Sequence, residues 1–363
     1  MVLISILGDF QSSHLPIFFE FKDKIKKHIV VHDDSKHDVQ QLKKIIKGQT
    51  DFLEGYGKFT ATNYEIITLK IDEDNYDDIL KCYENIMKHS KTPENIYLNT
   101  TDGLNSISII LSSMFLKAGA NVIAYDRYAN TYNLHTKSTM KKFKIKNNLD
   151  IKNHLKLKGY KLEDYVDKNI LNARKDDIYK LMGNSEEYKE FVNQFTTDPS
   201  CNIEKYKNYI NILDNLGKVN DTSFIQGSVF EEYIYHILVD NFDFDEVMLG
   251  VKIEFEKNFK NELDILMIKD NHLHTIECKF VNFINGEHYI YKTNSVIDYL
   301  DDDGKAMILS IGGENERYSK SGKKRSQFSK GDQGRASNGN IKIHQRKEFN
   351  KEAFLEDIQK WFL

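Results

Sequence analysis

The sequence predicts an α/β protein: a doubly wound parallel sheet comes first, followed by a basic helical connector and a compact α/β module. Two observations lead to this fold class. Short apolar runs alternate with amphipathic runs over about the first 130 residues, and the alternation returns after Gly227. At 363 residues the chain also exceeds the size that one hydrophobic core normally serves, which favours more than one domain.

Five apolar runs near the N-terminus are typical of strands, and four amphipathic runs lie between them. The runs with strand character are 2–7, 28–32, 64–71, 95–99 and 121–125. Those with helical spacing are 16–27, 38–52, 76–89 and 103–117, and Gly119 is a stop signal for the last of them. Repeated strand and helix imply a parallel sheet with helices on both faces. We expect this sheet to be complete before residue 130.

The rest of the chain divides into a helical connector and the second module. Helices are expected in the connector at 162–171, 176–182, 186–195 and 203–216. The module is expected to have helices at 228–239, 295–300 and 351–362 and strands at 262–268, 274–280, 306–311 and 341–344. The predicted domains are therefore 1–140, 141–222 and 223–363.

Positive charge is concentrated in two segments, although the formal net charge of the chain is -4. Residues 314–347 hold ten Lys or Arg against three acidic residues, and residues 141–161 hold eight Lys against one Asp. Basic patches in an acidic chain suggest contact with a polyanion, and a solvated lysine-rich surface is the alternative for either segment. In the first of them, Lys323, Lys324 and Arg325 are candidates for contacting substrate phosphates.

Composition indicates a folded cytoplasmic protein. Hydrophobic residues make up 40% of the chain and aromatic residues 12%, too many for a disordered protein. The three cysteines are scattered without CxxC spacing, so neither a disulfide framework nor a structural zinc site is expected. The apolar run 2–7 lacks a basic leader, and no stretch approaches the roughly 20 apolar residues of a membrane span. We expect no membrane partner.

A predicted hairpin brings two carboxylates together. If Asp270–Asn271 is a two-residue turn, Lys269 faces His272. The same register then places Asp264 opposite Glu277, with Cβ atoms about 4.5 to 5.5 Å apart. Because the neighbouring residues are apolar, the repulsion between these carboxylates would be poorly screened, and a bound divalent cation would remove it.

Lys279 completes a group suited to phosphodiester hydrolysis. It follows Glu277 by two residues, so its side chain emerges on the same face of the strand. A metal ion lowers the pKa of a bound water, and an adjacent ammonium can orient that water or stabilise developing charge. The alternative is a plain hairpin in which Glu262 pairs with Lys279.

A third carboxylate is expected from the helix that follows Gly227. On a helical wheel Glu231 lies at the edge of the apolar side, whereas Glu232 points nearly opposite to it. Glu231 is therefore the better candidate for the site. The alternative is that both glutamates interact with the helix dipole on a solvated surface.

The order and spacing of these residues resemble the PD-(D/E)xK restriction-endonuclease-like nucleases. The pattern G-x-x-F-E, E-x-D-x-L, E-x-K is carried by Gly227, Phe230, Glu231, Glu262, Asp264, Leu266, Glu277 and Lys279. One departure is that Leu263 stands where this family commonly has Pro. The resemblance implies that Asp264, Glu277 and Glu231 bind Mg²⁺ or Mn²⁺ and that Lys279 assists attack by water. Lys292 resembles an additional lysine that some members place near the site.

The N-terminal part resembles the CARF sensor domain of CRISPR-associated proteins, a Rossmann-like sheet that binds cyclic oligoadenylate. The resemblance rests on two loops that follow strand ends, where ligands of doubly wound sheets bind. The candidate ligand residues are Gly8, Asp9, Gln11, Ser12 and Ser13 in the first loop and Thr100, Thr101, Asp102, Gly103 and Asn105 in the second. The second loop opens a helix whose free N–H groups suit a phosphate. Ordinary helix capping is the alternative for the residues before Gly103.

Together the two parts resemble CRISPR ancillary nucleases that join one CARF domain to one restriction-endonuclease-like domain. This implies activation by cyclic tetra-adenylate, a homodimer, and metal-dependent cleavage of DNA, RNA or both in type III CRISPR antiviral defence. A two-fold symmetric ring is naturally bound by two copies of one loop set, which also favours a dimer. Two alternatives remain: a restriction or repair nuclease without a cyclic nucleotide activator, and a non-enzymatic regulator that binds nucleic acid.

Overall fold

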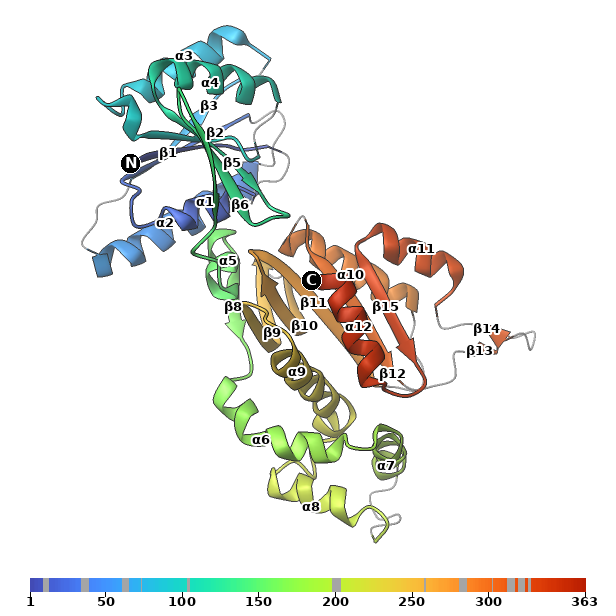
Figure 1. The fold of residues 1–363 in the computed structure, drawn as a ribbon. Helices are drawn as coiled ribbons and strands as arrows, with labels where there is room; N and C mark the ends of the chain where they lie inside the picture. The colour runs from blue at the N-terminus through green and yellow to red at the C-terminus, as the bar shows by residue number, and fades with distance from the viewer. Residues whose placement is uncertain are drawn as a thin grey trace. The chain divides into compact units, whose positions relative to one another are not determined.

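A computed structural model describes the chain and divides it into two compact units, Met1–Leu162 and Glu163–Leu363. It describes all residues except 9–12, 34–38, 61–64, 73, 103–104, 198–203, 258, 281–285, 302, 312–316, 319–323 and 326–327. Figure 1 shows the elements of each unit along the chain. Each unit is described by itself below.

The first unit is built on a seven-stranded sheet. In sheet order its strands are β3 (Glu65–Lys70), β2 (Lys27–His32), β1 (Val2–Ile6), β4 (Ile96–Asn99), β5 (Asn121–Asp126), β6 (Thr131–His135) and β7 (Met140–Lys144). The first five are parallel, as the alternating pattern predicted, and the last two are antiparallel. The expectation that the sheet ends before residue 130 is wrong, because β6 and β7 extend it.

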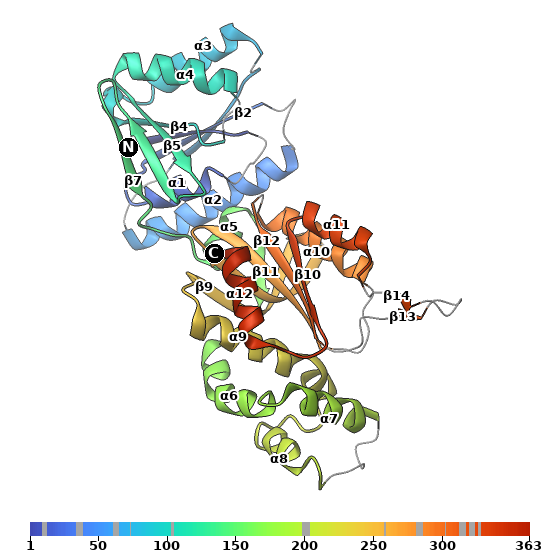
Figure 2. The ribbon, with the colours of Figure 1, turned by 45° about the vertical axis from the view of Figure 1, so that its right-hand side comes forward.

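Helices cover both faces of the five parallel strands (Figures 1 and 2). The helices are α1 (Leu15–Glu20), α2 (Val39–Thr60), α3 (Tyr76–Met87) and α4 (Asn105–Ala118), with a 3₁₀ turn at Pro93–Asn95 and α5 (Ile151–Leu157) packed against α2. One core lies between the sheet and α3 and α4, and Leu42 of α2 packs on the opposite face. Helix α4 ends as predicted at Gly119, whose φ of 88° suits a glycine.

The second unit is built on a six-stranded mixed sheet. In sheet order its strands are β15 (Ile341–Arg346), β12 (Lys305–Ile311), β11 (His272–Phe280), β10 (Phe259–Lys269), β9 (Glu246–Glu256) and β8 (Lys161–Asp164). A separate two-stranded ribbon is formed by β13 (Arg317–Tyr318) and β14 (Lys324–Arg325). The sequence pattern missed β8 and β9, and β8 takes the start of the helix expected at 162–171.

The helices of this unit pack on the sheet in two hydrophobic clusters. They are α6 (Lys168–Leu181), α7 (Ser185–Thr197), α8 (Lys207–Asn215), a π turn at Phe224–Ser228, α9 (Val229–Asn241), α10 (Gly286–Leu300), α11 (Lys330–Asn338) and α12 (Lys351–Phe362). Residues of α6, α7 and α8 are buried in the same hydrophobic cluster as α9 and the sheet. The segment 141–222, expected as a separate connector, is thus divided between the two units. The basic segment 314–347 contains α11 and β15.

The hairpin register predicted from the turn is confirmed. Asp270 and Asn271 have φ values of 50° and 72°, the left-handed pair that a tight hairpin turn requires. Strands β10 and β11 pair from Lys269↔His272 to Ile265↔Ile276. None of the described helices is both long and apolar enough to cross a membrane.

Candidate active site

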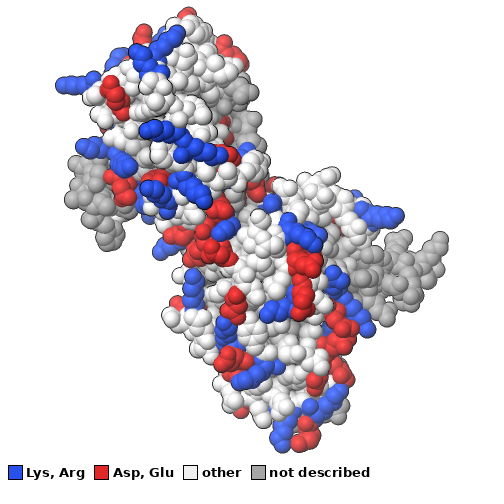
Figure 3. Space-filling view, viewed as in Figure 1, with Lys and Arg blue, Asp and Glu red and all other residues white. Residues whose placement is uncertain are grey.

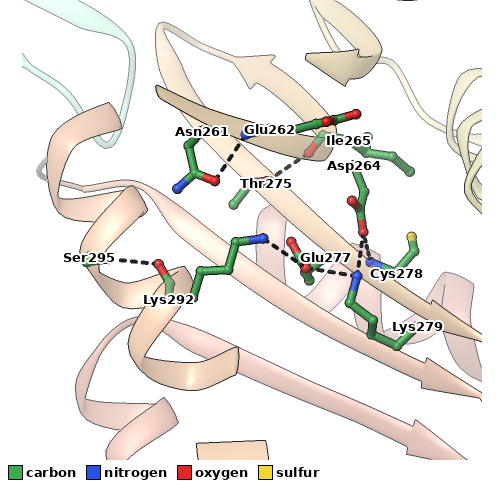
Figure 4. Close-up of polar contacts among 10 residues, drawn as sticks. All are labelled: Asn261, Glu262, Asp264, Ile265, Thr275, Glu277, Cys278, Lys279, Lys292 and Ser295. Atoms are coloured by element: carbon green, nitrogen blue, oxygen red, sulfur yellow. Dashed lines mark hydrogen bonds and ion pairs between the residues drawn. The ribbon is translucent and has the colours of Figure 1, made fainter. Parts of the chain in front are cut away.

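The strands β10 and β11 and the helix α10 bring two carboxylates and two ammonium groups together (Figure 4). Lys279 Nζ lies 2.8 Å from Glu277 Oε1 and 3.2 Å from Asp264 Oδ2. Lys292 Nζ lies 3.3 Å from Glu277 Oε1. The ammonium of Lys279 therefore bridges the two carboxylates that the predicted register places opposite each other. Pairing with Glu262, the alternative for Lys279, is not needed to explain where this ammonium lies.

Asp264 is held by the main chain of the opposite strand. The N–H of Cys278 donates to Asp264 Oδ2 over 2.7 Å. This side-chain contact lies just beyond Ile265↔Ile276, the last backbone pair of the two strands. The carboxylate thus accepts from Cys278 and Lys279 at once, which fixes its direction.

Burial and mutual repulsion raise the pKa of the acidic groups. The pKa of Asp264 rises from 3.8 to about 6, first because the carboxyl is buried and then because Glu277 is negative. The pKa of Glu231 rises from 4.5 to about 8, through burial and then through the charge of Asp264. Burial opposes charge on Lys279, but Asp264 and Glu277 outweigh it and raise the pKa of this ammonium. The two carboxylates therefore favour the protonated form of Lys279, which suits it to stabilise negative charge.

Helix α9 carries Glu231 to the site, and its N-terminal turn explains the preceding motif residues. A Cβ on Gly227 would lie 3.2 Å from Glu231 Oε1, so the glycine leaves room for this carboxylate. Phe230 is 1% exposed and stacks on Phe280, at the end of β11, with a centroid distance of 5.0 Å. The π turn before α9 is the kind of irregularity that often occurs at functional sites.

The alternative that both glutamates lie on a solvated surface is wrong, because Glu232 is buried. Its side chain is 1% exposed, and its Oε2 lies 2.8 Å from a guanidinium nitrogen of Arg174 on α6. Helix α6 covers the side of α9 to which Glu232 points. Glu232 is therefore tied to Arg174, while Glu231 is the glutamate whose charge interacts with Asp264.

Sequence reasoning missed Tyr289, whose ring lies 5.2 Å from Lys279 Nζ. A cation over an aromatic face is stabilised by the ring quadrupole. Tyr289 precedes Lys292 by three residues on α10, a helical spacing that could have indicated a shared face. The helix was expected to begin at 295, whereas α10 begins at Gly286 and includes both residues.

The two sensor loops lie at the ends of the neighbouring strands β1 and β4. A Cβ on Gly8 would lie only 1.5 Å from the carbonyl oxygen of Asp102, so the loops are in direct contact at this glycine. Asp9, Gln11, Ser12 and Gly103 lie outside the described residues, as does the side chain of Asn105. Ser13 is described and lies just before α1.

Thr100 and Thr101 fasten the second loop to strand β5. The N–H of Thr100 donates to the carbonyl of Ile123 over 2.9 Å. The hydroxyl of Thr101 donates to Asn99 Oδ1 and accepts from the N–H of Tyr125 over 3.1 Å. These bonds run to β4 and β5, and helix capping does not account for them. Sequence reasoning missed Asn99, which is 1% exposed and fixes the loop by accepting from the hydroxyl of Thr101.

The residues of the second unit also match a known protein family. Residues 219–329 match the family model described as "Card1-like, endonuclease domain". This segment of the second unit is therefore similar to Card1-like endonuclease domains. All five residues predicted for the catalytic site fall within the matched segment: Glu231, Asp264, Glu277, Lys279 and Lys292. A comparison with curated protein sequences gave no match.

Solved structures share the fold of the whole chain. Can2 from Sulfobacillus thermosulfidooxidans, in complex with cyclic tetra-adenylate, matches with a TM-score of 0.69 and 16% identity over 100% of this chain and 99% of that one. Protein VC1899 from Vibrio cholerae matches with a TM-score of 0.71 and 14% identity over 99% of this chain and 97% of that one. A type III CRISPR defence DNA nuclease activated by cyclic oligoadenylate matches with a TM-score of 0.51 and 10% identity, over 93% of this chain and 51% of that one. The predicted fold class, an α/β chain with a Rossmann-like sheet before a second α/β domain, is confirmed.

Proposed function

We propose that this protein is a metal-dependent nuclease of type III CRISPR antiviral defence that is activated by cyclic tetra-adenylate and cleaves or nicks DNA, RNA or both. The observation that carries the proposal is the position of Lys279 between Asp264 and Glu277. This triad of charges lies inside a Card1-like endonuclease domain. The match of the whole chain to Can2 in its complex with cyclic tetra-adenylate supports the proposed activator.

The carboxylates of the site suit a hard divalent cation such as Mg²⁺ or Mn²⁺. Among the described residues no group of three or more His, Cys, Asp or Glu is clustered tightly enough to enclose a metal ion. Mg²⁺, however, is commonly held by one or two carboxylates together with water and substrate phosphate. Burial and mutual repulsion raise the pKa values of Asp264 and Glu231, and a bound cation would favour the charged forms of both carboxylates. Asp264 and Glu277 would hold it, with Glu231 beside them.

The side chains then have separate roles in hydrolysis. A bound divalent cation would lower the pKa of a water ligand and offset phosphate charge. Lys279 would stabilise charge on the scissile phosphate and orient the attacking water, because it remains protonated. Lys292 pairs with Glu277, and because its side chain is about one-third exposed it can also approach the substrate.

We infer that the activator binds at the paired loops of the first unit. The contact between Gly8 and Asp102 makes one continuous surface of the ends of β1 and β4, where ligands of parallel sheets bind. A homodimer would present two such surfaces to a two-fold symmetric ring. The cyclic nucleotide can favour the active state only through its higher affinity for that state.

A cleavage assay with matched variants tests the proposal. Purified protein with Mn²⁺ is incubated with plasmid, single-stranded DNA or RNA, with and without each cyclic oligoadenylate. We expect cleavage only with cyclic tetra-adenylate and loss of cleavage in Glu277→Ala. Glu287→Ala, which removes an exposed glutamate from α10, is the control and should cleave normally.

The same assay separates the alternatives. Cleavage that is indifferent to every cyclic oligoadenylate favours a restriction or repair nuclease. Absence of cleavage under all conditions, with nucleic acid still bound, favours the non-enzymatic regulator. Cleavage by Glu277→Ala at the parental rate, with contaminating nuclease excluded, refutes the site assignment.

A further inference from the structure

The turn and hairpin of residues 127–149 in the first unit form the most one-sided charge distribution among its fully described segments. This stretch holds six Lys or Arg and no Asp or Glu. Its exposed lysines are Lys137, Lys141, Lys142, Lys144 and Lys146. The hairpin consists of the edge strands β6 and β7, and all five residues of β7 are exposed. Blue side chains gather on the face of this unit that Figure 3 presents.

The exposed lysines of this hairpin have few acidic partners. Lys142 pairs with Asp126 over 3.7 Å, and both side chains are well exposed, so the pair contributes little and is screened by salt. For the other exposed lysines of the hairpin, no carboxylate of the described residues lies within ion-pair distance. The hairpin therefore presents several free positive charges to any polyanion.

The spacing of the lysines suits a nucleic acid backbone. Lys142 and Lys144 lie on the same face of β7, and residues two apart on a strand are about 6.7 Å apart. Two positive charges at this separation can contact phosphates of one strand that runs along β7.

The hairpin is held in place before any ligand arrives. Phe143 stacks on Tyr132 with a centroid distance of 5.3 Å, and Tyr132 is 8% exposed. The N–H groups of Lys146 and Asn147 donate to the carboxylate of Glu20 on α1, over 3.0 and 2.9 Å. Little ordering of the backbone would be needed on binding, which preserves affinity.

An exposed aromatic ring lies next to these charges. Tyr128 is 87% exposed in the turn between β5 and β6, the largest exposure of any large hydrophobic side chain in the described part of the chain. The N–H of Ile145 donates to the carbonyl of Asn130 over 3.1 Å, so this turn is joined to the end of β7. Lysines on an edge strand can serve simply to prevent edge-to-edge aggregation, but that role does not explain Tyr128.

We propose that the β6–β7 hairpin of the first unit is a second nucleic-acid site, where lysines contact the phosphates of a single strand and Tyr128 stacks on an unpaired base. A positive surface with an exposed aromatic ring is the combination that binds single strands without sequence preference. The proposal rests on the proposed nuclease function, because it makes this strand part of the substrate. The proposed site belongs to the first unit, whereas the catalytic carboxylates belong to the second.

Binding is measured by fluorescence anisotropy with a labelled oligo(dT) strand in EDTA, where no cleavage occurs. The test variant changes Lys142 and Lys144 to Gln together, and the control changes the exposed Lys43 and Lys47 to Gln, which removes the same charge. The slope of log K against log salt should fall by about 0.7 per lost contact, hence by about 1.4 for the test variant. The control should keep the parental slope.

Tyr128→Ala should weaken binding of the strand by about fivefold or more and leave the salt slope unchanged. Equal slopes for the test variant, the control and the parent would overturn the hairpin site, and so would unchanged affinity in Tyr128→Ala. If cyclic tetra-adenylate displaces the oligo(dT) strand from the parent but not from the test variant, the hairpin binds the activator. Because these measurements need no cleavage, their failure is distinct from failure of the nuclease assay.

Discussion

Glu231→Gln should stabilise the metal-free protein in a pH-dependent way. The pKa of this carboxyl in the folded chain is about 8, against an ordinary value of 4.5. Between these two pH values the folded state keeps a proton that the unfolded state has lost, so the parental stability falls as pH rises. Glutamine has nearly the same shape and cannot ionise, so the variant escapes this loss.

The magnitude follows from the width of this window. Each pH unit between the two pKa values costs about 1.4 kcal/mol, so the difference between parent and variant approaches about 3 kcal/mol at pH 7 and about 5 kcal/mol above pH 8. For a unit of this size, 3 kcal/mol corresponds to roughly 6 to 12 °C in Tm. Below about pH 4.5 Glu231 is protonated in the folded and in the unfolded chain. The parent and the variant should then have the same stability.

Trp361 provides the readout, because it is the only tryptophan of the chain and lies in the second unit. It packs against the core of that unit, and its indole N–H donates to the carbonyl of Ala306 over 2.9 Å. Its fluorescence is followed during thermal unfolding in EDTA at about pH 4.5, 7 and 8. Glu287→Gln serves as the exposed control. A stabilisation by Glu231→Gln that is equal at all three pH values, or absent at pH 8, would refute the assigned ionisation.

Three further predictions concern single contacts. Lys279→Ala should lose most cleavage while Mn²⁺ binding, measured by calorimetry, persists; loss of metal binding as well would show that the proposed roles are wrong. Arg174→Met should destabilise the second unit by about 3 to 5 kcal/mol, because Glu232 would be left charged and buried, and adding Glu232→Gln should restore much of it in the same Trp361 assay. Gly8→Ala should abolish binding of cyclic tetra-adenylate but spare Mn²⁺ binding, because the new methyl group would overlap the carbonyl of Asp102; normal activator binding would exclude this loop contact from the sensor.

The catalytic hairpin was predictable because its signals are local. Asp270 and Asn271 set the turn, and a register fixed by the turn carries over to the distant pair Asp264 and Glu277. The strand period of two then placed Lys279 on the face of Glu277. No long-range information was needed for this part of the site.

The errors arose where packing between distant segments decides the structure. Strand β7 has no apolar alternation, since every one of its residues is exposed, and its pairing with β6 holds it in the sheet. The helical wheel placed Glu232 opposite the apolar side of α9, and nothing in α9 indicates that α6 packs there. Three basic residues of the segment 314–347 were expected to contact substrate, and their side chains lie outside the described part of the chain: Lys323, Lys324 and Arg325. That expectation stays a prediction.

The hydrogen bond from Cys278 to Asp264 has a consequence for which sequences the site can tolerate. The donor is a main-chain N–H, and every amino acid except proline supplies one. The thiol of Cys278 itself is buried and contributes only its volume. Position 278 should therefore accept alanine, serine or valine in a saturation library and reject proline, so a residue at the centre of the catalytic hairpin would vary among small side chains in active variants.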